Sequence, residues 1–222
     1  ENRFYTLDVL DKESFLYKDN IDSLMNNTYC TKFTNRGYYY VIRQDIYRKN
    51  GEIYIKKDAI GYDNLPKNEY FCYNPTDVKY VEGKVLFDYL ITLTEIEQKE
   101  LLKKFYDYIF EKYCIDENTL SGELFDCHLR NFIYDGELFY AIDTEYFYKK
   151  GISKSFFIYR SLTTYKSELA NLYQYFLDLY NLTYSIEEDK NFSKQIIRKY
   201  LYFNRDDSLK HINSDIVKQY FI

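Results

Sequence analysis

The chain has 222 residues, 46% of them hydrophobic and 21% aromatic, so it can bury a core and is not a disordered protein. Its net charge is −5 with scattered Lys and Arg, which argues against a nucleic-acid-binding protein, and no apolar run is long enough for a transmembrane helix. Four cysteines without a CxxC pair, two histidines and no signal-peptide pattern argue against structural zinc and favour reduced thiols in a cytoplasmic protein.

The first ninety residues have the composition of short strands and turns. Residues 38–42 and 52–56 are rich in β-branched and aromatic types, and Asn50-Gly51 stands just before the second run. This pattern predicts a β-hairpin. The stretch 66–75, bounded by the only two prolines, is typical of a loop, and residues 78–90 predict a strand, a glycine turn and a short helix.

From Thr94 onward the hydrophobic period becomes helical. Thr94 and Glu97 have the spacing of a capping box, which marks the start of a helix. The helix should be buried and about 19 residues long. Its apolar positions follow at i+4 spacing: Leu101, Phe105, Ile109 and Tyr113, with Leu102, Tyr106 and Phe110 beside them.

A polar loop over 115–125 should follow this helix, and then a second hairpin. Asp135-Gly136 lies between the β-prone runs 131–134 and 137–140, and Asp-Gly in such a position is a strong hairpin signal. The chain beyond 155 is predicted to be helical, with further helices starting at Ser185 and over 213–222. One helical stripe comprises Leu169, Leu172, Phe176, Leu179 and Tyr180.

Three polar residues around the second hairpin carry the candidate chemistry. Asp126 and Asn131 lie five residues apart, and Asp143 follows the second strand. A hairpin turning at Asp135-Gly136 brings Asn131 back beside Asp143. Two oxygen ligands for Mg²⁺ and a carboxylate that orients a hydroxyl are what phosphoryl transfer from a nucleotide requires.

These residues also resemble a known family. The segment from Asp126 to Asn131, DCHLRN, resembles the D-x-H-x-x-N catalytic loop of aminoglycoside phosphotransferase-like and other atypical kinases. Ile142-Asp143-Thr144-Glu145 resembles the I-D-[FWL]-E that stands where protein kinases have Asp-Phe-Gly. Tyr80-Val81-Glu82-Gly83 is similar to their hinge. The likeness covers roughly residues 50–150, and the compact size resembles bacterial lipopolysaccharide core heptose kinases.

The resemblance implies an α+β, protein-kinase-like bilobal fold. Residues 1–83 would form a reduced β-rich N-lobe with the hinge, and residues 84–222 a mainly helical C-lobe with the catalytic loop and the metal-binding hairpin. The implied activity is an ATP-dependent kinase with Mg²⁺ or Mn²⁺. Its acceptor would be a hydroxyl, expected on a sugar of a glycan or glycolipid, which leaves room for a peripheral membrane contact.

The resemblance also implies the roles of single residues. Asp126 would be the catalytic base or hydroxyl-orienting group, with His128 near the transferred phosphoryl group. Asn131 and Asp143 would be metal ligands. Backbone groups of Tyr80, Val81 and Glu82 would hydrogen-bond adenine. The phosphate-binding lysine would be Lys56, with Lys18 as the alternative.

The sequence departs from the family pattern at several points. Leu124-Phe125 stands where protein kinases have His-Arg before the catalytic Asp, and no glycine-rich phosphate loop is present, because Gly37 is isolated. Little chain separates Lys56 from the hinge, which leaves scarce room for a helix with a Glu partner. The ATP-binding lobe is therefore reduced or strongly diverged.

Other interpretations of the same residues stay open. Asp126 and Asn131 are also common turn residues, and His128 could be an ordinary loop histidine. Glu145 is either a further metal contact or a solvated carboxylate, and Cys127 is a weak candidate nucleophile. At the level of function, the alternatives are a protein kinase effector, a nucleotide-binding pseudokinase or scaffold, and a transferase that moves AMP.

Overall fold

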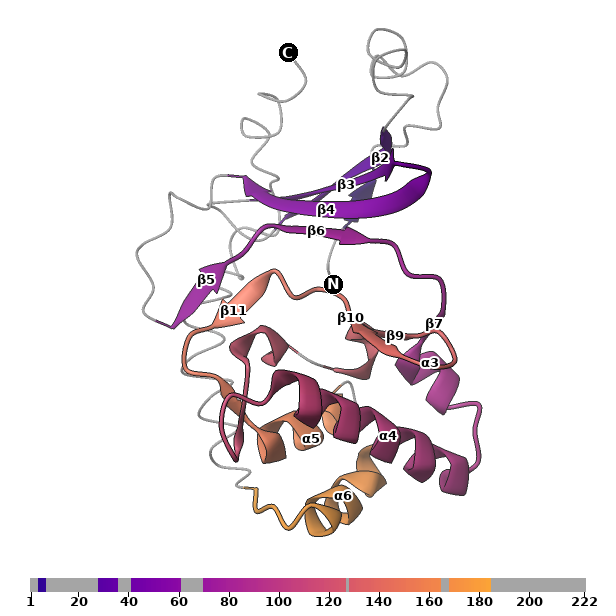
Figure 1. Cartoon of the computed structure of the whole chain (residues 1–222), viewed down its shortest axis with the longest axis vertical. Helices are drawn as coiled ribbons and strands as arrows, with labels where there is room; N and C mark the ends of the chain where they lie inside the picture. Colours follow the sequence, from indigo (N-terminus) through magenta and orange to yellow (C-terminus); the bar gives the residue numbers. More distant parts are fainter. Residues whose placement is uncertain are drawn as a thin grey trace, which may run out of the picture. The chain divides into compact units, whose positions relative to one another are not determined.

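The computed structural model describes residues 4–6, 28–35, 41–60, 70–126, 128–164 and 168–184, and it has an α+β fold. Two compact units make up this described part (Figure 1). The first contains the described residues up to 60 and Tyr73–Tyr80, and the second contains Tyr70–Cys72 and residues 81–184. The chain changes unit between residues 80 and 81, whereas the sequence predicted a lobe boundary after 83.

The first unit is built around one antiparallel sheet of five strands in the order β1-β2-β3-β4-β6. The predicted first hairpin is confirmed as β3 and β4, but its first strand continues to Lys49, beyond the expected 38–42, and residues 38–40 lie outside the described residues. Its loop is the two residues Asn50 and Gly51, with φ of 54° and 84°, the positive values that a tight turn between twisted strands requires. The strands are β1 Phe4–Thr6, β2 Thr28–Asn35, β3 Val41–Lys49, β4 Glu52–Ile60 and β6 Thr76–Lys79.

The two faces of this sheet differ in chemistry, as the register of β3, β4 and β6 shows. One face carries charged and tyrosine side chains that pair with one another, including the ion pairs Arg43–Asp45 at 2.9 Å and Lys56–Asp58 at 2.8 Å. The other face is mostly aliphatic, because alternate residues of a strand point to opposite sides. Its members are Ile42, Gln44, Ile46, Arg48, Ile53, Ile55, Lys57, Ala59, Thr76 and Val78.

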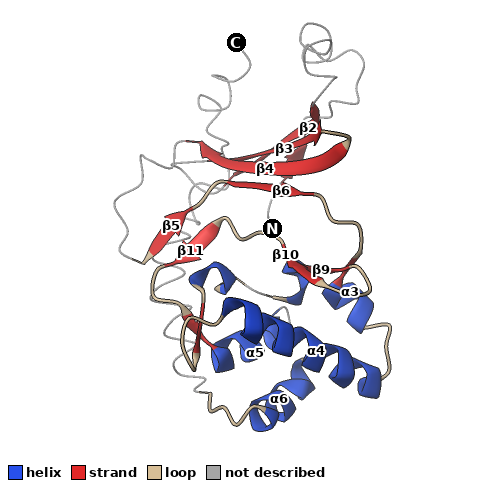
Figure 2. Ribbon diagram, in the orientation of Figure 1, coloured by secondary structure: helices blue, strands red, loops and turns tan. Residues whose placement is uncertain are grey.

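The second unit contains all the described helices (Figure 2). Its central helix, α4, spans Glu95–Tyr113, and Thr94 caps it in the predicted capping box with Glu97. One further helical segment precedes α4 in the sequence and the others follow it. They are α3 Leu86–Leu90, η2 Gly122–Leu124, η3 Leu129–Asn131, α5 Lys154–Thr163, η5 Ala170–Leu172 and α6 Tyr173–Leu179.

Aromatic side chains form the core of the second unit. Phe105 and Tyr106 on α4 are fully buried, and their rings contact Phe132, Phe157 and Phe176 from β9, α5 and α6. The buried stripe of α4 is centred on Leu102, Phe105, Tyr106 and Ile109. Rings in such edge-to-face contacts add to the stabilisation from burial alone. The core therefore fixes α4 against the hairpin that follows it.

Three small sheets complete the second unit, and two of them lie where loops were predicted. β8, within the expected loop 115–125, pairs with β12, and β5, within the expected loop 66–75, pairs with β11. Short strands of this kind depend on partners far away in the sequence, so local composition does not predict them. Their bounds are β5 Phe71–Tyr73, β7 Lys84–Val85, β8 Thr119–Leu120, β9 Phe132–Tyr134, β10 Phe139–Ala141, β11 Tyr146–Tyr148 and β12 Ile152–Ser153.

The predicted helical region beyond 155 is confirmed as far as the structure describes it. Leu169, Leu172 and Phe176 are buried, whereas Leu179 is 42% exposed because α6 ends there. The helices predicted from Ser185 and over 213–222 lie outside the described residues. No described helix combines the length and the apolar character that crossing a bilayer requires.

Candidate active site

The loop from Asp126 to Asn131 is closed by hydrogen bonds to its own backbone. The carbonyl oxygen of Asp126 accepts from the backbone N–H of His128 at 3.2 Å and from Nδ2 of Asn131 at 2.8 Å. The backbone N–H of Asn131 donates to the carbonyl of His128 at 2.8 Å. The first and last residues of the D-x-H-x-x-N pattern are thus linked directly.

The second hairpin brings Asn131 next to the segment that carries Asp143. Strands β9 and β10 are antiparallel, with Phe132 opposite Ala141, and the N–H of Ile142 donates to the carbonyl of Asn131 at 2.8 Å. The hairpin was predicted, but its loop has four residues, 135–138, rather than Asp135-Gly136 alone. Asp135 Oδ1 accepts the N–H groups of Glu137 and Leu138, both at 2.8 Å, which stabilises this longer loop.

Asp143 has an unusual backbone conformation. Its φ is 64°, in the left-handed region that most residues with a Cβ avoid. Asp and Asn tolerate this region better than other non-glycine residues. Residues held there tend to occur at functional sites, where the surrounding structure imposes the conformation. Asp143 is exposed.

Buried hydrophobic residues flank the polar ones on both sides of the loop. Phe125 precedes Asp126, Leu129 lies inside the loop, and Phe132 follows Asn131; each is 1% exposed. Their burial anchors the backbone at three points within eight residues. Such support holds a functional side chain in a defined geometry better than a solvated loop would.

His128 is neutral at physiological pH. Burial, with a smaller effect from the positive charges of Arg160 and Arg130, lowers its pKa to about 4. The ring can therefore serve as a hydrogen-bonding group near neutral pH, but it carries no positive charge toward a phosphate. Arg130 itself lies over the ring of Phe87 on α3, with 4.6 Å from its guanidinium carbon to the ring centroid.

Glu145 is buried, with 1% of its surface exposed. The interpretation of Glu145 as a solvated carboxylate after a strand is therefore wrong. A buried carboxylate is costly unless other groups compensate its charge, so this side chain belongs to the interior of the unit that holds the site. In the sequence, the only feature that drew attention to Glu145 was the pattern I-D-T-E, and this pattern did not indicate that the side chain is buried.

Gly83, the last residue of the predicted hinge 80–83, is packed against the second hairpin. A Cβ on Gly83 would lie 2.7 Å from both Ile133 Cγ2 and the Tyr134 carbonyl oxygen, so glycine is required at this close approach. The N–H of Tyr80 is already used, since it donates to the carbonyl of Ile53 at 2.7 Å. Within the described part of the chain, Val81 and Glu82 make no backbone–backbone hydrogen bond, which leaves their groups available for a base.

Lys56 lies on the charged face of the sheet. Its ammonium pairs with Asp58, and this hydrogen bond raises the pKa of Lys56. The adjacent Lys57 lies on the aliphatic face, opposite Gln44 on β3 and Thr76 on β6, and it is half-buried. Strand alternation from Ile53 and Ile55 could have identified Lys57 from the sequence. Lys18, Gly37 and Cys127 lie outside the described residues.

The oxygen atoms of Asn131 and Asp143 are suited to magnesium bound together with a nucleotide. They are too few for a metal that is held by protein ligands alone. In the described part of the chain, no three His, Cys, Asp or Glu side chains are grouped so that they could hold a metal. Magnesium bound with a nucleotide needs only one or two protein oxygens besides phosphate and water. Asn131 Oδ1 and the carboxylate of Asp143 are oxygens of the required type, so the residues present fit the ion.

Comparisons with protein-family models, with curated proteins and with solved structures give no match to this chain.

Proposed function

We propose that this chain is an ATP-dependent phosphotransferase of the protein-kinase-like type, which transfers the γ-phosphoryl group to a hydroxyl. The observation that carries the proposal is a pair of hydrogen bonds made by Asn131. Its side-chain N–H donates to the backbone carbonyl of Asp126, and its own carbonyl accepts the N–H of Ile142, the neighbour of Asp143. These bonds support a common site for the three motif residues, which belong to the same unit. A second supporting observation is the left-handed backbone conformation of Asp143, because such strained conformations are concentrated at functional sites.

Magnesium would be held by Asn131 and Asp143, and the ion would neutralise charge on the phosphates of ATP. The Nδ2 of Asn131 is engaged by Asp126, which fixes the amide plane. Among the described residues, Oδ1 of this amide takes part in no hydrogen bond, and this leaves it as a ligand. The exposed carboxylate of Asp143 supplies the second ligand.

Asp126 would orient the acceptor hydroxyl and take its proton as the new bond to phosphorus forms. In phosphoryl transfer most of the catalysis comes from positioning and electrostatic stabilisation, so a carboxylate on a well-anchored loop suits this role. Burial of Phe125 and Leu129 holds that loop. His128 is neutral, and in this mechanism it donates or accepts a hydrogen bond and does not act as a cation.

Lys57 is a better candidate than Lys56 for the lysine that contacts the α- and β-phosphates. Lys56 lies on the charged face beside Asp58, whereas Lys57 lies on the mostly aliphatic face, in the same row as Ile55 and opposite Gln44 and Thr76. A mostly aliphatic surface that also carries a cation suits a nucleotide, because the base packs on apolar groups and the phosphates need a positive charge. Backbone groups of Val81 and Glu82 would hydrogen-bond adenine.

The acceptor in this proposal is a sugar hydroxyl of a glycan or glycolipid. The support is the histidine at the third position of the loop, which small-molecule and lipopolysaccharide kinases share by resemblance. A protein hydroxyl is the rival acceptor. Incubation with radiolabelled ATP and either a glycolipid extract or a protein extract distinguishes the two by where the label accumulates.

The experiment that tests the proposal compares the wild-type chain with Asp126→Ala. We expect ATP with Mg²⁺ to raise the Tm of both proteins, because Asp126 is not a metal ligand in the proposed arrangement. Turnover of ATP should fall by about 10²–10⁴-fold in the variant, the usual contribution of a positioned general base.

Glu137→Ala, at the exposed tip of the hairpin, is the matched control and should keep wild-type turnover. A Tm increase with ATP but no turnover in the wild type would indicate a nucleotide-binding scaffold. AMP, in place of phosphate, found on the acceptor by mass spectrometry would assign the chain to the AMP transferases.

A further inference from the structure

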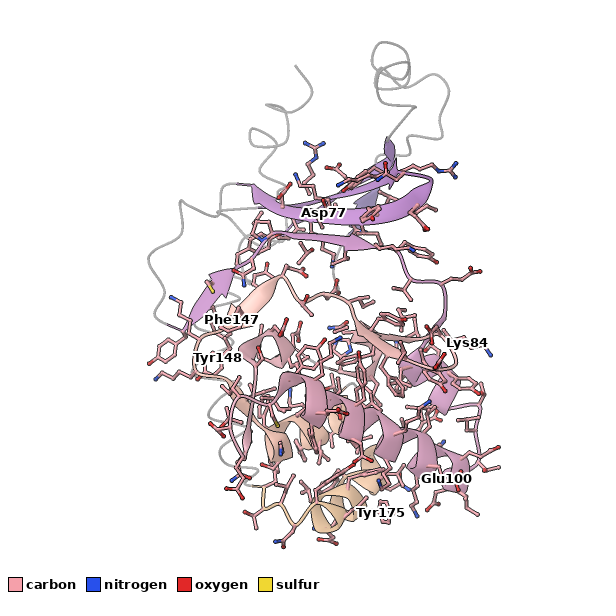
Figure 3. The ribbon with its side chains drawn as sticks, viewed as in Figure 1. Asp77, Lys84, Glu100, Phe147, Tyr148 and Tyr175 are labelled. Atoms are coloured by element: carbon pink, nitrogen blue, oxygen red, sulfur yellow. The ribbon has the colours of Figure 1, made fainter. Side chains whose placement is uncertain are left out.

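A short strand from before the hinge is built into the unit that holds the candidate site. Residues Tyr70–Cys72 belong to the second unit, although the described residues up to 60 and Tyr73–Tyr80 belong to the first. Their strand, β5, pairs with β11, and the N–H of Lys149 donates to the carbonyl of Tyr70 at 2.8 Å. Figure 1 shows β5 and β11 side by side, and Figure 3 shows Phe147 and Tyr148 on β11.

The ring of Phe71 contacts the two segments that flank the candidate site. Its centroid lies 5.0 Å from that of Phe125, the residue just before Asp126, and 5.2 Å from that of Tyr148, on the strand that follows Asp143. Phe71 is only 2% exposed. One buried ring therefore packs against both the entry to the catalytic loop and the exit from the metal-binding segment.

The same two segments also touch directly at Gly122. A Cβ on this glycine would lie 1.7 Å from the carbonyl oxygen of Tyr148, a distance at which no side chain fits. The backbone of β11 therefore lies directly against the turn that leads through Phe125 to Asp126. Gly122 and Phe71 together form a junction between the residues that precede Asp126 and the residues that follow Asp143. The Asn131–Ile142 hydrogen bond, by contrast, joins residues that lie between the two aspartates in the sequence.

We infer that β5 is a brace for the candidate site and that Phe71 is a positioning residue, which fixes the loop of Asp126 relative to the segment of Asp143. The inference rests on the proposed function for the roles of the two aspartates. The Asn131–Ile142 hydrogen bond joins the segments between the two aspartates, and the β5 junction joins their outer flanks. The chain is therefore anchored on both sides of each aspartate, which favours precise placement of the two residues.

The brace predicts a specific effect of Phe71→Leu on the full chain. Removing the ring leaves space between Phe125 and Tyr148, so backbone amides in both 122–131 and 142–149 should exchange hydrogen faster. Turnover should fall by about tenfold or more, because small displacements of reacting groups are costly, while the KM for ATP changes much less. Phe71→Met, whose longer and flexible thioether side chain can keep contact with both rings, should show smaller changes in the same direction.

Phe176→Leu is the matched control. Phe176 is equally buried in the same unit, and its ring contacts Tyr106 on the central helix rather than the flanks of the site. The Phe176→Leu variant should have a lower Tm, but hydrogen exchange in 122–131 and 142–149 and the value of kcat/KM should not change.

Two results would overturn the brace. One is faster exchange confined to 70–73 in Phe71→Leu, and the other is an equal loss of kcat in Phe71→Leu and Phe176→Leu. If the wild type has no turnover at all, the phosphotransferase proposal fails, and the exchange pattern alone decides whether β5 couples the two segments. Should Phe71→Leu fail to fold, the same readouts apply to Phe71→Met.

Discussion

The two units differ in what holds them together. In the second unit more than twenty hydrophobic side chains are buried, and aromatic rings connect α4 with β9, α5 and α6. In the described part of the first unit, Ile42 is the only hydrophobic side chain that is fully buried, and ion pairs cover one face of the sheet. Exposed ion pairs contribute little to stability, whereas buried aromatics contribute much.

This difference matches the tasks that the proposal gives to each unit. The second carries Asp126, Asn131 and Asp143, whose positions must be exact to within a fraction of an ångström for chemistry. The first offers a sheet whose aliphatic face would bind a nucleotide base, and such binding tolerates adjustment. Rigid support is therefore concentrated where the proposed reaction takes place.

The largest of these effects is expected at Asp143, the proposed metal ligand in the second unit. Asp143→Ala should lower turnover by about 10²-fold or more at a fixed Mg²⁺ concentration, because an electrostatic contact to the developing charge is lost. Raising Mg²⁺ should restore part of this loss, and titration with EDTA should inactivate the wild type. Turnover that is unchanged in Asp143→Ala would remove the metal site from the second unit.

Substitutions of hydrophobic residues should cost more stability in the second unit than in the first. Phe105→Ala, in the centre of the second core, should lower the free energy of unfolding by about 3–5 kcal/mol. Ile55→Val, on the half-buried sheet face, should cost about 0.5–1.5 kcal/mol. Urea denaturation followed by circular dichroism measures both, and equal costs would contradict the contrast between the units.

The adjacent lysines of β4 provide a test within the first unit. Lys57→Ala should raise the KM for ATP about tenfold or more, the effect of losing a charge-assisted phosphate contact. Lys56→Ala should leave this KM nearly unchanged and cost at most about 1 kcal/mol in stability, because its pair with Asp58 is exposed. Steady-state kinetics decides between them, and the reverse order would return the role to Lys56.

The smallest effect is expected at the tip of the second hairpin. Hydrogen bonds from the N–H groups of Leu138 and Glu137, and from the hydroxyl of Tyr140, lower the pKa of Asp135. Its ionised form therefore stabilises the folded state at neutral pH, and this contribution is lost as the pH falls through the lowered pKa. The Tm difference between wild type and Asp135→Asn should be small at pH 7 and should shrink on acidification; a growing difference would contradict it.

Elements with local signals were predictable from the sequence. The capping pair Thr94 and Glu97 defined the start of α4, and Asn50-Gly51 defined the first hairpin. The second hairpin also placed Asn131 beside the segment of Asp143, as expected from Asp135-Gly136. In each case the determining residues lie within a few positions of the element.

Contacts between distant segments were not predictable. The pairing of β5 with β11 joins residues about seventy-five positions apart, and nothing in 66–75 indicates its partner. The close approach of Gly122 to Tyr148 and the burial of Glu145 depend on the same tertiary packing. Strand alternation does place Lys57 on the same face as Ile53 and Ile55, whereas the likeness of Ile53–Lys56 to a family motif favoured its neighbour Lys56 for the proposed phosphate contact.

The passage of residues 70–72 through the second unit has a practical consequence for dissecting the protein. A fragment that begins at the hinge would contain all three motif residues and yet lack β5. Strand β11 would then present an uncovered edge, a known cause of aggregation, and Phe125 would lose a buried neighbour. A fragment intended to reproduce the helical unit must therefore start upstream of Tyr70, or receive that strand as a separate peptide.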